Sequence, residues 1–96
     1  MGMKEAYEQQ QRAKLKEWQA DIDKLQARAE KAGASARIEF HQQIEDLRAQ
    51  RKATESKLDD LARAGEQQWD AMKSGIEGAL RDMGDRIKAT SALFRK

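Results

Sequence analysis

Apolar side chains recur every three or four residues along almost the whole chain, and this spacing constrains the fold more than any other feature. From Leu15 to Ala29 the steps alternate between three and four residues, which is the pattern of a coiled-coil seam. From Leu61 to Met83 the steps repeat as four, four and three, which straightens or reverses a supercoil. A helix with one apolar stripe must cover it against other helices. The spacing therefore predicts a coiled coil or a slender helical bundle.

The composition agrees with an all-α fold. Charged residues make up 38% of the 96 residues and aromatic residues only 5%, while proline and cysteine are absent. Good helix formers such as alanine, glutamine, glutamate, lysine, arginine and leucine dominate. The length suits one small domain, so we expect residues 1–96 to form a single domain of long amphipathic helices.

Without proline, glycine is the strongest signal for a turn. Gly33 is followed two residues later by Ser35, which suggests that one helix ends at Gly33 and that Ser35 caps the next. A second break near Gly65 would divide the chain into three segments of about 30 residues, as an up-down-up three-helix bundle requires.

In the alternative, one helix runs from about Lys4 to Ala64, straight through Gly33, at a cost of about 1 kcal/mol relative to alanine. The seam around Trp18 would then need a second chain to cover it. The small side chains of Ala29, Ala32 and Ala36 suit a close approach of two helices. Long helices that self-associate are therefore favoured over a closed monomer, although the sequence leaves open whether the chain turns at Gly33.

The leading hypothesis is a non-enzymatic structural or interaction protein that forms homo-oligomers through this seam. The side chains expected in the self-association seam are Leu15, Trp18, Ile22, Leu25, Phe40, Ile44, Leu47, Leu58, Leu61, Trp69, Met72 and Ile76. Two polar residues, Arg51 and Thr54, also occupy seam positions.

No pattern indicates catalysis, a cofactor, a metal site or a small-molecule substrate. His41 is the only histidine, and residue 38 is isoleucine where a metal-binding bundle would place the glutamate of a Glu-Xaa-Xaa-His pair. Nucleic-acid binding is not expected either. Arg48, Arg51 and Lys52 share one side of a helix, but neighbouring acidic residues dilute their potential.

The segment 69–96 has one apolar face, and we expect that face to pack in the bundle with Gly75 and Gly78 beside the contact. The alternative is a helix that lies on an anionic membrane surface, because residues 86–96 carry basic side chains and no acidic ones. The residues of this alternative lipid face are Leu80, Met83, Ile87, Phe94, Arg86, Lys88, Arg95 and Lys96.

Three stretches, "LKEWQADIDKLQARAEKA", "ARIEFHQQIEDLRAQRKA" and "QQWDAMKSGIEGAL", resemble the small bacterial coiled-coil proteins of the stress-response family. The resemblance covers most of residues 5–80 and implies a helical protein without catalytic residues. The final third is also similar to the amphipathic repeats of apolipoprotein-type and desiccation-protective proteins, which implies lipid association. The first ten residues lack an apolar core, so we expect a cytoplasmic protein, peripheral to a membrane under the lipid alternative.

Overall fold

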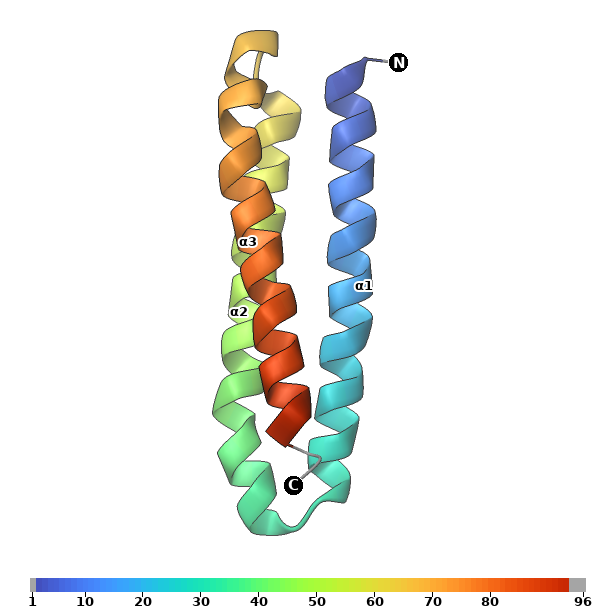
Figure 1. Ribbon diagram of the computed structural model, residues 1–96, viewed down its shortest axis with the longest axis vertical. Coiled ribbons are helices and arrows are strands. Elements are labelled where there is room, and N and C mark those ends of the chain that lie inside the picture. The colour runs from blue at the N-terminus through green and yellow to red at the C-terminus, as the bar shows by residue number, and fades with distance from the viewer. Residues whose placement is uncertain (1, 94–96) are drawn as a thin grey trace.

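The chain folds into a three-helix bundle. The computed structural model describes residues 2–93, and of Ala36 only the backbone. The helices are α1 (Met3–Lys31), α2 (Ala34–Arg63) and α3 (Glu66–Leu93), and each runs antiparallel to the helix before it (Figure 1). The bundle measures 50 × 19 × 17 Å. The prediction of an all-α fold built from long helices is confirmed, and the slender bundle is the form it takes.

The first turn, between α1 and α2, consists of Ala32 and Gly33. Ala32 ends α1 with φ −78° and ψ 168°, and Gly33 begins α2 as its N-cap with φ −63° and ψ 165°. The predicted arrangement, with Gly33 ending one helix and Ser35 capping the next, is therefore wrong, because Ser35 already lies inside α2. Between residues 2 and 93 no residue adopts a positive φ, so this turn does not use the left-handed conformation that favours glycine.

The favoured alternative, an uninterrupted helix from about Lys4 to Ala64, is also wrong, because the helix ends at Lys31. The turn lets α1 fold back onto α2, which buries Leu15, Ile22 and Leu25 within the same chain. Burying one such side chain completely stabilises the fold by roughly 1.5–3 kcal/mol. Several of them together outweigh the few backbone hydrogen bonds that are lost at one break, at about 1 kcal/mol each.

The core runs the length of the bundle along the predicted seam. All the predicted seam side chains are buried in this one chain except Trp18 and Met72, which are half-buried. Four further side chains complete the core: Ala29, Leu80, Met83 and Ile87. The seam is thus covered by the three helices of one copy, and contact between copies through it requires the bundle to open.

Ion pairs along the outer edge align α1 with α2. Arg12 pairs with Glu8 at 2.7 Å on its own helix and with Asp59 of α2 at 2.9 Å. About three turns further along, Arg48 of α2 pairs with Asp23 of α1 at 3.3 Å. Exposed pairs of this kind contribute only about 0–1 kcal/mol each, so they fix the alignment of the helices more than their stability.

Polar side chains align α2 with α3. Gln50 donates a hydrogen bond to Asp82 at 2.7 Å, and the buried Thr90 donates to Gln43 at 3.2 Å. Thr54, one of the polar residues in the seam, is also buried, and its hydroxyl donates to the carbonyl oxygen of Gln50 at 2.8 Å. A buried hydroxyl bonded to its own helix avoids the cost of an unsatisfied polar group, which explains how threonine fits a core position.

Candidate interaction groove between α1 and α3

The side of the bundle between α1 and α3 carries most of its aromatic side chains. Tyr7 and Trp18 are eleven residues apart, close to three helical turns, so they lie on the same side of α1. Trp69 and Lys73 are one turn apart on α3. Because α1 and α3 run in the same direction (Figure 1), Tyr7 near the start of α1 meets Trp69 near the start of α3.

At this end the contact between α1 and α3 consists of two aromatic rings and a cation. The rings of Tyr7 and Trp69 are 5.7 Å apart between centroids and are tilted by 46°. The Nζ atom of Lys73 lies 4.4 Å from the centroid of Trp69 and 5.6 Å from that of Tyr7. A cation over an aromatic face contributes about 0.5–1 kcal/mol at an exposed site, so Lys73 stabilises the contact between the two rings.

The hydroxyl group of Tyr7 links α1 to α3. Its single proton is shared between two acceptors, Oε1 of Glu77 at 3.1 Å and the carbonyl oxygen of Lys73 at 3.3 Å. Burial raises the pKa of Tyr7 to about 12, and the hydrogen bond and charge of Glu77 act in the same direction. The phenol therefore stays protonated, and remains a donor, well above its ordinary pKa of 10.0.

Farther along the same side of the bundle, a groove between α1 and α3 opens beside Trp18 as a hollow of about 380 Å³. Leu80 supplies apolar surface, and the Nζ atom of Lys14 lies 4.7 Å from the centroid of a Trp18 ring. The indole nitrogen Nε1 is buried without a hydrogen-bond partner among the described residues. The residues that line the hollow are Gln10, Gln11, Lys14, Trp18, Glu77, Leu80 and Arg81. Its aromatic wall and charged rim suit non-covalent contact with another molecule.

The Trp18 ring packs directly against the backbone of α3 at Gly84. A Cβ atom added there would lie 2.9 Å from Cζ2 of Trp18, whereas Cβ atoms at Gly75 or Gly78 would meet nothing within 4 Å. The prediction that Gly75 and Gly78 flank the contact is therefore wrong, because both lie on the outward side of α3. The signal for Gly84 was in the sequence, since it follows Leu80 of the apolar stripe by one helical turn.

The fold separates the residues of the alternative lipid face into buried apolar side chains and exposed basic ones. Its described apolar side chains are buried in the core: Leu80, Met83 and Ile87. Its described basic side chains are exposed: Arg86 and Lys88. The remaining predicted members lie outside the described residues: Phe94, Arg95 and Lys96. The closed bundle therefore does not present this face as a continuous surface.

The other residues considered in the sequence lie on the surface or in ion pairs. His41 is exposed, and Arg51 pairs with Glu55 at 2.8 Å. Within residues 2–93, no three or more His, Cys, Asp or Glu side chains cluster closely enough to hold a metal ion. None of the helices in this part of the chain has both the length and the apolar character needed to cross a membrane.

Comparison of the chain with protein-family models, with curated proteins and with solved structures found no match.

Proposed function

We propose that this chain is a non-enzymatic helical interaction protein that associates with further copies of itself through its apolar seam. The observation that carries the proposal is the similarity of the three helices in length and in apolar pattern. The helices contain 29, 30 and 28 residues, and each turns one apolar stripe inward. A helix from a second copy can therefore take the place of its equivalent in the bundle and bury the same side chains.

A stress-related role in the bacterial cytoplasm, which the resemblance of the chain implies, is part of the same proposal. Self-association depends on protein concentration through mass action. A seam that is covered within one copy at low concentration and shared between copies at high concentration would connect the amount of protein in the cell to its assembly state.

Sedimentation equilibrium over a wide range of concentrations tests the proposal. The expected result is a rise in mass from that of one chain, 10.9 kDa, towards an integer multiple of it. A mass of one chain at every concentration would contradict self-association. A heat-denatured and refolded sample serves as a control for aggregation, because a specific assembly returns to the same mass.

A second candidate function is peripheral binding to anionic membranes. The observation that favours it is the uninterrupted apolar face of α3, which runs from Trp69 to Ile87 and is covered by the other helices, with Arg86 and Lys88 exposed beside it. If the bundle opens, this face becomes available to a lipid surface. Co-sedimentation with anionic vesicles at low and high salt tests this function, and an absence of salt-sensitive binding removes it.

A further inference from the structure

We propose that two copies of this chain exchange α1. In the exchanged dimer the turn at Gly33 straightens, α1 and α2 become one continuous helix, and α1 packs between α2 and α3 of the second copy. This inference rests on the proposed self-association and names its geometry. The partner is a second copy of the same chain, and the surface it occupies is the one that α1 covers in the closed bundle.

The backbone of the turn is close to that of a helix. The φ angles of Ala32 and Gly33 are −78° and −63°, near the helical value of about −63°. Their ψ angles, 168° and 165°, are extended, where a helix needs about −42°. Straightening the turn therefore requires a large change in only two torsion angles, one in each residue.

The turn is also weakly held in its closed form. The N-cap residue of α2 is a glycine, which has no side chain to accept hydrogen bonds from the first N–H groups of the helix, and a Cβ atom added to it would meet nothing within 4 Å. Across the turn Arg37 donates to the carbonyl oxygen of Glu30 at 3.1 Å. In a continuous helix the first N–H groups of α2 would bond to the last carbonyl groups of α1, and the flanking alanines favour that state.

The other turn, at Gly65, is held more firmly, so Gly33 is the hinge. Lys4 of α1 donates to the carbonyl oxygens of Ala62 at 3.2 Å and Ala64 at 2.8 Å, just before Gly65. The N–H group of Gly65 donates to the side chain of Gln68 at 3.4 Å. These contacts satisfy carbonyl and N–H groups at that end of the bundle, whereas among the described residues the Gly33 turn has the Arg37–Glu30 contact alone as a counterpart.

The exchange preserves the contacts that α1 makes. Leu15, Ile22 and Leu25 would be buried against the partner's core instead of their own. The Arg12–Asp59 ion pair and the Tyr7–Glu77 hydrogen bond would form between copies. The closed monomer and the exchanged dimer therefore differ mainly at the hinge and in the entropy lost on association, so a small change at Gly33 can shift the balance.

Two substitutions of Gly33 should act in opposite directions. Gly33→Pro fits the closed turn, because φ is −63° and the preceding Ala32 is extended, but it disrupts a continuous helix. Gly33→Ala should raise the equilibrium constant for forming the continuous helix by about fivefold per hinge. Proline should lower the same constant by about a hundredfold relative to alanine. Sedimentation equilibrium should show a tighter dimer for Gly33→Ala and a monomer for Gly33→Pro. Equal dimerisation by the two variants would overturn the exchange.

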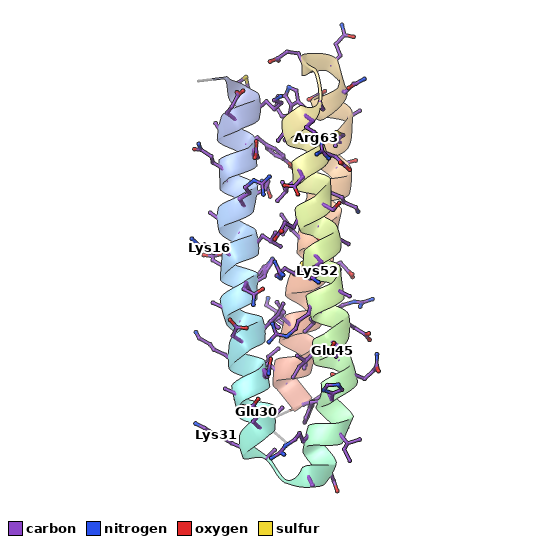
Figure 2. The ribbon with its side chains drawn as sticks, turned by 180° about the vertical axis from the view of Figure 1, so that it is seen from behind. Lys16, Glu30, Lys31, Glu45, Lys52 and Arg63 are labelled. Carbon is purple, nitrogen blue, oxygen red and sulfur yellow. The ribbon has the colours of Figure 1, made fainter. Side chains whose placement is uncertain are left out.

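A distance measurement identifies the exchanged form directly. Lys16 and Lys52 are exposed and lie at nearly the same level on α1 and α2 (Figure 2). The chain has no cysteine, so Lys16→Cys and Lys52→Cys accept two spin labels without competing sites. A doubly labelled chain diluted into unlabelled protein reports the distance within one chain by pulsed electron paramagnetic resonance.

In the exchanged dimer the two labels lie on one helix, about 54 Å apart at a rise of 1.5 Å per residue. In the closed bundle they lie on neighbouring helices, whose axes are about 8–10 Å apart, and the distance is far shorter. A dimer that keeps the short distance would overturn the exchange but leave self-association intact. A monomer at every concentration would overturn both. This measurement also holds if Gly33→Pro fails to fold.

Discussion

The indole ring of Trp18 on α1 rests on the backbone of Gly84 on α3. Space favours glycine there, since a Cβ atom would approach Cζ2 of the ring to 2.9 Å, closer than packed carbon atoms come, and the ring would have to shift. The backbone conformation of Gly84 is helical, so its conformational freedom plays no part. The contact therefore sets how closely the two helices approach at this level of the bundle.

Substituting this glycine should destabilise the bundle even though alanine is the better helix former. We expect Gly84→Ala to lower the free energy of unfolding by about 1 kcal/mol. Displacing the packed ring should cost about 1–3 kcal/mol, and the higher helix propensity of alanine should offset about 1 kcal/mol of that cost. Gly78→Ala is the matched control and should raise stability by about 0.5–1 kcal/mol, since its Cβ meets nothing. Urea denaturation followed by circular dichroism measures both, and equal stabilisation by the two changes would contradict the contact.

Two isoleucines of α2 should differ strongly in how far a charge at their position changes stability. Ile44 is 5% exposed and Ile38 is 77% exposed. Ile44→Asp should cost at least about 3 kcal/mol, because it buries a carboxylate without a partner, and should disrupt folding or assembly. Ile38→Asp should change stability by no more than about 0.5 kcal/mol. Thermal unfolding and sedimentation compare the two, and unchanged helicity and mass for Ile44→Asp would refute its place in the core.

The titration of Tyr7 should be shifted upwards by folding. Tyr7 is the only tyrosine, so the ultraviolet absorbance of the phenolate reports it alone. Its midpoint should lie near pH 12 in the folded protein and near 10 in urea. Because the folded pKa is the higher one, its stabilising contribution is complete below pH 10 and is lost as the pH rises towards 12.

The variant Glu77→Gln separates the causes of this shift. It removes the negative charge beside the phenol but leaves the burial of the ring, which is the larger cause. The midpoint of Tyr7 should therefore fall in this variant while remaining above 10. A midpoint in the folded wild-type protein equal to that in urea would show that Tyr7 is not packed between α1 and α3.

The hydroxyl group of Thr54 should contribute little to stability, and its methyl group more. Thr54→Val keeps the shape of the side chain and should change the free energy of unfolding by less than about 1 kcal/mol, because the lost hydrogen bond is to its own helix. Thr54→Ala should cost about 1–2 kcal/mol through the cavity it leaves. A loss for valine as large as that for alanine would show that the hydroxyl carries the stabilisation, through its bond to Gln50 and its 3.8 Å contact with Sδ of Met83 on α3.

The helices and the core were predictable because both follow from one local property, the spacing of apolar residues. Leu15, Ile44 and Ile76 stand on the same stripe in the sequence and meet in the same core. The turn at Gly33 was harder to predict. The free-energy cost of breaking the helix is local and can be estimated from the residues around Gly33. The compensating stabilisation comes from packing α1 against α2, and no local sequence pattern reveals it.

The contacts between α1 and α3 could not be predicted from the sequence for the same reason. Tyr7 lies far from Trp69 and Lys73 in the sequence and meets them because the two turns set how α1 and α3 align. Helical spacing alone gives each residue a side of its own helix but no partner on another. Gly84 is the exception, because its distance of one turn from Leu80 already placed it on the inward stripe.

The placement of the aromatic residues gives the molecule an internal optical reporter. Both tryptophans and the tyrosine border α1 and α3, and residues 34–63 contain neither type. Excitation energy absorbed by Tyr7 should pass efficiently to Trp69, whose ring is 5.7 Å away. Emission from the unmodified protein should therefore follow the parting of these two helices, while α2 contributes no signal of its own.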